Sequence, residues 1–167
     1  MHLTATKAFG LLLTSQSLSL LGSGMTRFAL LVWAYEQEGT ATALALLGFF
    51  ITTTYVLASP IAGVFVDRWD RRKVLFFSDL GSGLMTALML ILFLGGELQI
   101  WHLYLMEGIA GVLEAFQDPA YAASVSLLVP KETYTRSNAL IGTARSVTRL
   151  LAPALAGLLL QNSALDV

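Results

Sequence analysis

The sequence predicts an all-α integral membrane protein with five transmembrane helices. Two observations predict this fold class. Of the 167 residues, 56% are hydrophobic and only 13% are charged, whereas about 25% of the residues of an average soluble domain are charged. In addition, long segments carry no charge at all, and a membrane-crossing helix needs about 20 mostly apolar residues. A chain of 167 residues is long enough for five such helices joined by short loops.

The net charge and the cysteine count exclude several classes of protein. With 10 Lys and Arg against 11 Asp and Glu, the net charge is −1, so the chain lacks the excess of basic residues expected of a protein that binds nucleic acid. It also has no cysteine, which excludes disulfide scaffolds, thiolate metal sites and cysteine nucleophiles. We therefore expect no nucleic acid, no metal and no cofactor.

The first three spans are the most apolar ones. Their predicted ranges are 9–33, 43–66 and 74–95. The first contains the single charge Arg27, the second contains none, and the third has Asp79 near its beginning. A cleavable signal peptide is the alternative for the first, because Lys7 precedes an apolar run. The further spans that follow directly favour a membrane helix.

Two more spans have helical length and an otherwise apolar composition, but they contain several ionisable residues. Their predicted ranges are 101–122 and 139–161. The ionisable residues are Glu107, Glu114, Asp118, Arg145 and Arg149. Since length and composition still favour membrane crossing, we predict spans four and five here.

The charges of the loops predict the orientation in the membrane. Lys and Arg are found before span one and in the loops 67–73 and 123–138, whereas the other two loops contain Glu and neither Lys nor Arg. Cytoplasmic loops are enriched in Lys and Arg. We therefore predict a multi-pass protein of the cell membrane whose N-terminus and loops 67–73 and 123–138 are cytoplasmic.

The ionisable residues of the spans form two complementary faces. A charged side chain at the bilayer centre costs about 2.5 to 3.5 kcal/mol on insertion scales, so it usually faces a partner or a wet cavity. The carboxylates of span four are spaced by seven and four residues, which places them within about 40° of one another around the helix. The arginines of span five are four residues apart and share one face.

These faces predict three ion pairs, formed directly or through water. Counted by helical rise, the proposed partners lie at similar depths. The pairs are Glu114 with Arg149, Asp118 with Arg145, and Glu107 with Arg27. Charge pairs that line a cavity suit a transporter that alternates between inward-facing and outward-facing states. A channel, or pairs that only lock the helices together, are the alternatives.

The segment between spans two and three reads GVFVDRWDRRK from position 63. Its spacing G-x-x-x-D-R-x-x-R-R closely resembles the signature loop of the major facilitator superfamily, which usually reads G-x-x-x-D-R-x-G-R-R. The matching residues are Gly63, Asp67, Arg68, Arg71 and Arg72. Asp70 stands where that family usually has glycine in the turn.

This resemblance implies a fold and a role for the loop. Members of the family have twelve helices in two six-helix halves, so the five spans correspond to most of the N-terminal half. We expect the chain to be a fragment that lacks the sixth helix and the C-terminal half, which is then its partner. The resemblance also implies that Asp67, Arg71 and Asp118 form a cytoplasmic latch in the outward-facing state. This role competes with the pairing of Asp118 and Arg145, and one carboxylate can share both partners.

Span five carries a second, partial match. Pro153 and Gly157 resemble the end of the G-P-x-x-G-G motif of export-type members, while Ala152 and Ala156 replace glycines. An ordinary membrane-helix proline is the alternative. The phrases GMTRFA from Gly24 and DPA from Asp118, with the amphipathic stretch 125–133, resemble the macrolide-efflux and siderophore-exporter branch.

The resemblance implies a proton-motive exporter of small amphipathic molecules that works by alternating access. Arg27, Glu107 and Glu114 are the expected cavity residues, and an acidic side chain would take the proton. The R-x-x-x-G pattern of proton-coupled drug antiporters is absent, since Tyr104 and Glu107 precede the relevant glycines. An importer or uniporter of the same fold is the alternative.

An intramembrane enzyme or a structural membrane protein is less favoured. The chain has no H-E-x-x-H helix and no nucleotide-binding P-loop, and its histidines, His2 and His102, lie at the predicted edges of the spans. Hydrolytic, metal-dependent and ATP-driven chemistry therefore lack their required groups. We predict that the protein is not an enzyme.

Overall fold

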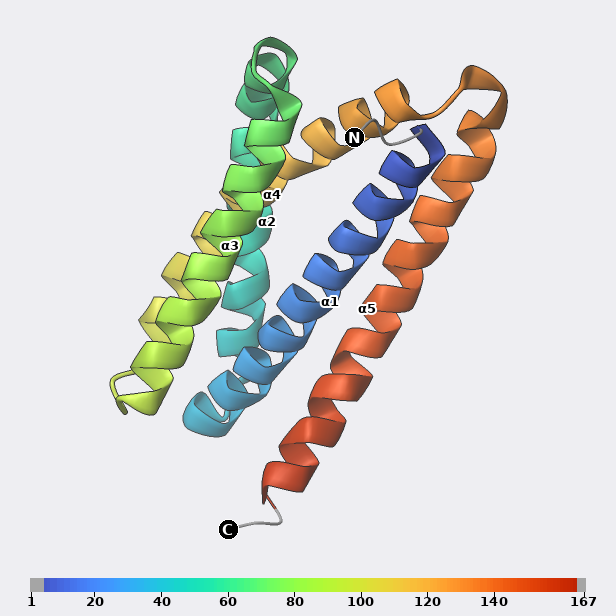
Figure 1. Ribbon diagram of the computed structural model, residues 1–167. Helices are drawn as coiled ribbons and strands as arrows, with labels where there is room; N and C mark the ends of the chain where they lie inside the picture. The colour runs from blue at the N-terminus through green and yellow to red at the C-terminus, as the bar shows by residue number, and fades with distance from the viewer. Residues whose placement is uncertain (1–4, 165–167) are drawn as a thin grey trace. The chain divides into compact units, whose positions relative to one another are not determined.

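The computed structural model describes residues 5–164, and throughout this range the regular elements are helices (Figure 1). In chain order they are α1 (Ala5–Glu38), α2 (Ala41–Arg68), α3 (Arg71–Leu94), α4 (Ile100–Leu128), the short 3-10 helix η1 (Lys131–Thr133) and α5 (Tyr134–Ala164). The prediction of an all-α protein with five long helices is confirmed.

The helices differ in how apolar they are. By length and composition, α1 from Lys7, α2 and α3 are able to cross a membrane. Helices α4 and α5 have 29 and 31 residues, which at about 1.5 Å per residue exceeds a hydrocarbon core of about 30 Å. These two helices carry most of the ionisable residues that the sequence places within the predicted spans.

The helices extend beyond the predicted spans. In the range 123–138, α4 continues to Leu128 and α5 already begins at Tyr134, so only a short connection with η1 interrupts the helices. Pro130 precedes η1, where its missing N–H and fixed φ prevent continuation of α4. The difference arises because the end of an apolar run marks the edge of the hydrocarbon, whereas a helix can continue into the polar interface.

Two glycines allow tight connections between α1 and α2 and between α3 and α4. Gly39 follows α1 with φ +63° and its amide donates to the Tyr35 carbonyl at 2.8 Å. Gly96 lies between α3 and α4 with φ +71°. A residue with a Cβ is strained in this left-handed region. Thr40 then caps α2, since its hydroxyl accepts from the amide of Ala43 at 3.4 Å.

The chain divides into two compact units. Unit 1 contains the residues up to Val32 and those from Val125 onward, and unit 2 contains Trp33–Ser124. Unit 1 therefore holds most of α1, the end of α4, η1 and α5, whereas unit 2 holds α2, α3 and most of α4. Both crossings between the units occur inside continuous helices, α1 and α4.

In unit 1, α1 and α5 run in the same direction (Figure 1). A Cβ built at Gly24 would lie 2.8 Å from the Cβ of Ala152, and one at Gly157 would lie 3.9 Å from Cε1 of Phe28. The contacts advance along both helices together, so the helices are parallel. Small residues allow such close backbone approach.

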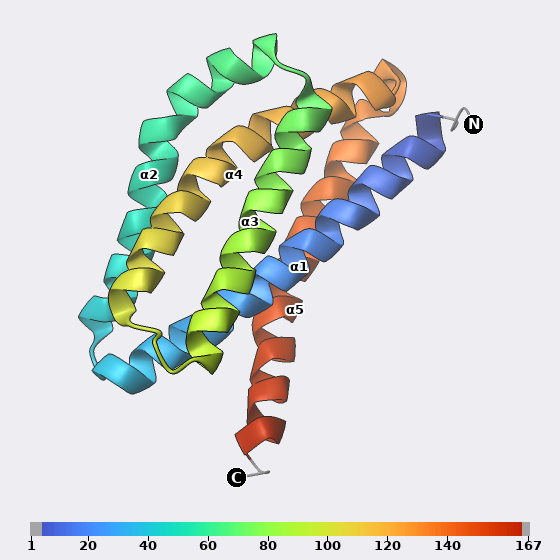
Figure 2. The same cartoon turned by 60° about the vertical axis from the view of Figure 1, so that its left-hand side comes forward.

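In unit 2, α4 packs against both α2 and α3 (Figure 2). Phe50 of α2 stacks on Tyr104 with ring centroids 5.4 Å apart, and further along α4 a Cβ on Gly111 would collide with Thr54 and the Ile51 backbone. Helices α2 and α4 are therefore parallel. The contacts of α4 with α3 advance in opposite directions along the two helices, so this pair is antiparallel; they join Gly81 to Leu113 and Asp79 to Gln117.

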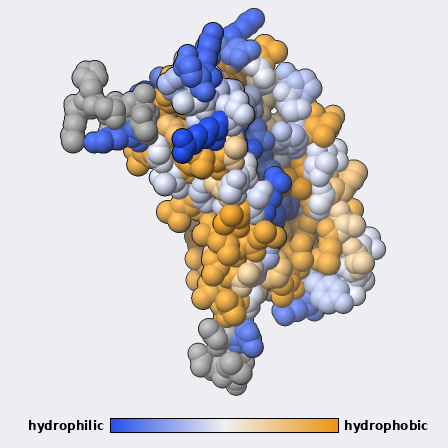
Figure 3. Space-filling view, turned by 90° about the vertical axis from the view of Figure 1, so that its right-hand side faces the viewer, coloured by the Kyte–Doolittle hydropathy of each residue, from blue (hydrophilic) through white to orange (hydrophobic). Residues whose placement is uncertain are grey.

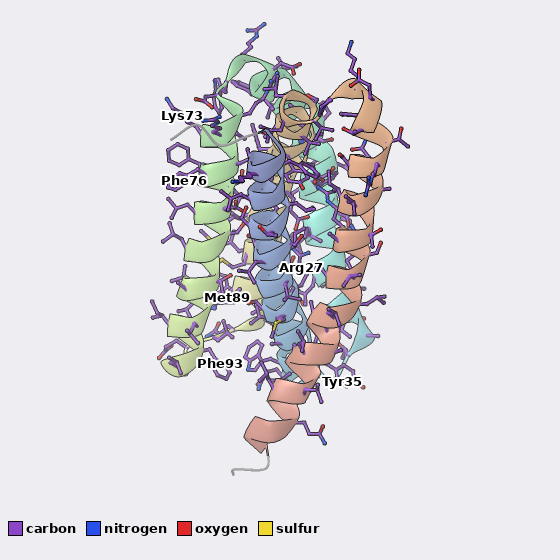
Figure 4. All side chains as sticks on the ribbon, turned by 45° about the vertical axis from the view of Figure 1, so that its right-hand side comes forward. Arg27, Tyr35, Lys73, Phe76, Met89 and Phe93 are labelled. Atoms are coloured by element: carbon purple, nitrogen blue, oxygen red, sulfur yellow. The ribbon has the colours of Figure 1, made fainter. Side chains whose placement is uncertain are left out.

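Much of the outer surface is apolar. Large hydrophobic side chains are exposed on several helices, as Figure 3 shows in orange, and Phe76 and Phe93 of α3 point away from the ribbon in Figure 4. Phe77 is 62% exposed and Leu94 75%. Soluble monomers rarely expose contiguous apolar areas beyond a few hundred Å², whereas lipid tails solvate such side chains.

Candidate transport site and charge network

The signature loop is a two-residue connection between α2 and α3. Trp69 ends α2, and its amide donates to the Phe65 carbonyl at 3.0 Å. Asp70 is the N-cap residue of α3: its Oδ1 accepts from the amide of Arg72 at 3.0 Å, and its backbone has φ −66° and ψ 110°. No left-handed residue is needed here, so the turn forms without the glycine that the family usually has. Aspartate is one of the preferred N-cap residues because it satisfies a free amide.

The charged residues of this loop are accessible. Asp67, Arg68 and Arg72 are exposed, whereas Arg71 is half-buried at the first position of α3. Gly63 is half-buried in the last turns of α2, and a Cβ there would meet nothing within 4 Å. The space around Gly63 therefore does not explain why a glycine stands at this position.

The distance from the loop to Asp118 can be counted along the helices. Gly111 of α4 lies at the level of Thr54 in α2. Asp118 comes seven residues later, about 10 Å along the axis, and Asp67 comes thirteen residues after Thr54, about 20 Å. Asp118 therefore lies about 10 Å short of Asp67 at the same end of unit 2. The latch of Asp67, Arg71 and Asp118 stays a prediction.

A polar cluster joins the three helices of unit 2 in the half of the bundle nearer the signature loop. The hydroxyl of Tyr55 in α2 donates to Oδ2 of Asp118 at 3.2 Å. The amide Nε2 of Gln117 donates to Oδ1 of Asp79 in α3 at 2.7 Å. All four side chains are half-buried. Two adjacent residues of α4 thus bind two different neighbouring helices.

Sequence reasoning identified only part of this cluster. Asp118 was expected to pair with arginines, and Asp79 was noted near the start of span three, but Tyr55 and Gln117 were missed. The available signal was a glutamine next to an aspartate in an apolar span. A polar residue that a membrane helix retains usually faces a partner.

The acidic face of α4 is present as predicted by its spacing. Helix α4 is continuous from Ile100 to Leu128, so Glu107, Glu114 and Asp118 lie within about 40° of one another around it. All three are half-buried, and the Oε2 atom of Glu107 is fully enclosed. The face lies on a helix that Gly111 holds tightly against α2.

The basic residues lie in unit 1. Arg145 is half-buried and Arg149 exposed on α5, and Arg27 is exposed on α1 (Figure 4). Arg145 precedes Ala152 by seven residues, so it lies within about 20° of the side of α5 that contacts α1. Arg27 follows Gly24, which lies against Ala152 of α5, by three residues. Each of the three predicted ion pairs therefore joins one unit to the other, and the pairs stay predictions.

The partial motif of span five lies in a continuous helix with a proline inside it. Pro153 has no N–H, so the carbonyl of Arg149 lacks its usual helical donor. Ala152 and Ala156, which replace glycines of the motif, are 2% and 4% exposed. At Ala152 the facing residue is Gly24, so α1 supplies the small residue for this close contact.

The histidine of α4 has a local structural role. Nδ1 of His102 accepts from the amide of Gln99 at 3.0 Å, which satisfies one of the free amides before the helix. Within residues 5–164 no group of three or more His, Cys, Asp and Glu side chains is arranged to hold a metal ion. His2 lies outside the described residues.

The whole arrangement can be compared with known proteins. Residues 12–164 match the family profile of the Major Facilitator Superfamily. The chain belongs to this superfamily. It is therefore part of a multi-pass membrane protein of a transporter family and not of an enzyme family, and the resemblance stated from the signature loop is confirmed.

Several curated relatives are named as efflux proteins. The chain is 30% identical over 144 residues to macrolide efflux protein A of Streptococcus pyogenes, covering 86% of this chain and 36% of that protein. It is 32% identical over 117 residues to macrolide efflux protein A of Enterococcus faecalis, covering 70% and 35%. It is 30% identical over 124 residues to the class H tetracycline resistance protein of Pasteurella multocida, covering 74% and 30%.

The chain thus spans about a third of the length of these relatives. No solved structure matches it significantly. The five helices agree with most of one six-helix half of the superfamily fold.

Proposed function

We propose that the protein to which this chain belongs is a secondary active exporter of small amphipathic molecules that works by alternating access. The chain contributes most of the N-terminal half. It lies in the cell membrane with its N-terminus in the cytoplasm. The observation that carries the proposal is the placement of ionisable residues inside long helices, α1, α4 and α5, in a chain whose relatives are named as efflux proteins.

The carboxylates and arginines have different proposed roles. Glu107 and Glu114, with Arg27, line the substrate pathway and offer opposite charges to the polar parts of an amphipathic molecule. Arg145 and Arg149 pair with the acidic face of α4 in one state of the transport cycle. Intramembrane ionisable residues usually mark substrate or ion pathways.

Protons are the proposed coupling ion. By analogy with the superfamily, Glu107 or Glu114 takes up a proton when substrate leaves. The enclosed Oε2 of Glu107 supports a location away from bulk water.

Transport by inverted membrane vesicles tests this function. The protein is expressed from its complete native reading frame, and uptake of a labelled macrolide is measured with and without an inside-acid pH gradient. We expect uptake that a protonophore abolishes. Uptake without gradient dependence would remove the antiport proposal and leave transport, whereas export from right-side-out vesicles that follows the substrate gradient alone, with or without a pH gradient, would favour a uniporter.

A matched pair of variants connects the assay to this chain. Glu107→Gln removes a carboxylate inside α4, and Glu97→Gln removes an exposed one in the loop before it. We expect the first to abolish gradient-driven uptake and the second to retain it. Equal activity of both variants would contradict the role of Glu107.

A further inference from the structure

Helix α4 is bound from two sides at one level. Gln117 and Asp118 are adjacent in sequence and therefore point about 100° apart around the helix. One reaches α3 through Asp79 and the other accepts from Tyr55 of α2, at 2.7 and 3.2 Å. The two hydrogen bonds together define both the rotation and the height of α4 relative to its neighbours in unit 2.

The residue that follows this double contact is Pro119. Proline has no N–H and clashes with the preceding turn, so the carbonyl of Ala115 loses its helical donor at this point. Sharp bends of long helices occur at such positions. Five residues after Pro119, at Ser124, unit 2 ends and α4 continues into unit 1.

The part of α4 before Pro119 is also held by close packing. Gly111 lies directly against the backbone of Ile51, and Leu113 lies against Gly81 of α3. Both contacts and both hydrogen bonds precede the proline, and Ala120 and Tyr121 directly after it are buried as well. The part of α4 up to Pro119 is therefore fixed to α2 and α3, and the helix continues from there into unit 1.

We propose that Gln117 and Asp118 are positioning residues for transport, which together form an anchor that fixes the rotation and height of α4 against α2 and α3. This proposal rests on the proposed transport function. The anchor holds the acidic face of α4 in place during the transport cycle. The donors are neutral groups, the Gln117 amide and the Tyr55 hydroxyl, and the acceptors are carboxylates of Asp79 and Asp118.

Exchanging donor and acceptor tests the anchor. Gln117→Glu places a second carboxylate against Asp79 and removes the donor. Adding Asp79→Asn restores a hydrogen bond with the roles reversed. In the complete protein, we expect Gln117→Glu to lower the maximal rate of vesicle uptake about tenfold with little change in KM, because a membrane-buried side-chain hydrogen bond is replaced by repulsion of like charges. The double variant recovers most of the rate.

A control variant and a second test variant accompany this pair. Gln161→Glu makes the same change at an exposed glutamine of α5, and its rate remains that of the wild type. Tyr55→Phe removes a single hydroxyl with little effect on packing and lowers the maximal rate about threefold, again at unchanged KM. Rates are normalised to the amount of protein in the membrane.

The outcomes separate the anchor from the transport function. A double variant as slow as Gln117→Glu, or a Gln117→Glu variant at the wild-type rate, overturns the anchor. Vesicles in which the wild type carries no substrate overturn the proposed function instead. In that case the thermal unfolding midpoint of the purified variants tests the contact. The anchor requires that Gln117→Glu lowers this midpoint and that the double variant restores it. An unchanged midpoint in Gln117→Glu contradicts the anchor.

Discussion

The two units of the chain carry opposite charge inside their helices. Between Asp79 and Asp118 the charged residues within the helices of unit 2 are acidic, whereas those within α1 and α5 of unit 1 are Lys7 and the arginines at positions 27, 136, 145 and 149. Each set alone is costly in a low-dielectric environment, and a charged partner reduces that cost. Each of the three predicted ion pairs therefore combines a carboxylate of unit 2 with an arginine of unit 1.

Within each unit, helices contact one another through small residues. In unit 2 a close glycine contact between α2 and α4 is accompanied by hydrogen bonds to both neighbours of α4. In unit 1 a close contact joins Gly24 to Ala152, a hydrogen atom opposite a methyl group. A polar contact fixes register more strictly than packing of small groups, because a buried polar group that loses its partner is expensive. The comparison can be tested unit by unit.

The largest expected effect comes from substitution of Gly111, which disrupts the packing of unit 2. Gly111→Leu forces a side chain into the Ile51 backbone and the Thr54 hydroxyl, and backbone cannot move aside. We expect a loss of more than about 3 kcal/mol and no folded protein after detergent extraction. The control is Gly108→Ala, whose methyl group would lie 3.7 Å from Thr54 in ordinary contact; a wild-type yield of Gly111→Leu would contradict the close contact.

The corresponding change in unit 1 is smaller and can be repaired. Gly24→Ala brings two methyl groups to 2.8 Å, and we expect a cost of about 1 to 3 kcal/mol from overpacking. Gly24→Ala combined with Ala152→Gly removes the clash and restores the thermal unfolding midpoint. A double variant less stable than the single one would show that α1 and α5 do not meet at these residues.

The next smaller effect is expected at Asp70, which caps α3 at the signature loop in unit 2. Asp70→Ala removes the acceptor of the Arg72 amide, which costs about 1 kcal/mol. Asp70→Gly, the residue usual in the family, loses only a few tenths of a kcal/mol. Chemical unfolding of the two variants measures the order, and equal stability of Asp70→Ala and wild type would contradict the cap.

The smallest effect is expected at Gly157 in unit 1. Its added methyl group would lie 3.9 Å from Phe28, so Gly157→Ala fits and changes stability by less than about 1 kcal/mol, of the order of its helix propensity gain. If transport nevertheless falls at unchanged stability, the residue acts in the movement of α5, as the export-type motif implies. A large loss of stability would instead show that the space around Gly157 is smaller than described.

The number and order of the helices could be predicted because three segments are long and apolar enough to cross a membrane, and two more have helical length and an otherwise apolar composition. The cap at Asp70 can also be predicted from the sequence, since aspartate before a helix is a recognised start signal. The ends of α4 and α5 cannot be predicted in this way, because hydropathy indicates the edge of the hydrocarbon and not the last helical residue.

The contacts of single polar residues could not be predicted in the same way. The pairing of Gln117 with Asp79 depends on the height of α4 relative to α3, and that of Asp118 with Tyr55 on its height relative to α2. These heights follow from the packing at Gly81 and Gly111, which spacing within one helix does not contain. The predicted pairs between the units depend on a register of the same kind.

Charge exchange between Glu114 and Arg149 tests the predicted pairing of the acidic face of α4 with the arginines of α5. Glu114→Arg and Arg149→Glu are made separately and together in the complete protein, and vesicle uptake of a labelled macrolide is measured at equal amounts of protein in the membrane. We expect each single variant to lose uptake, because the predicted pair then consists of two like charges. We expect the double variant to recover a measurable part of the wild-type uptake. Loss in both single variants without any recovery in the double variant would contradict the pairing of the acidic and basic units.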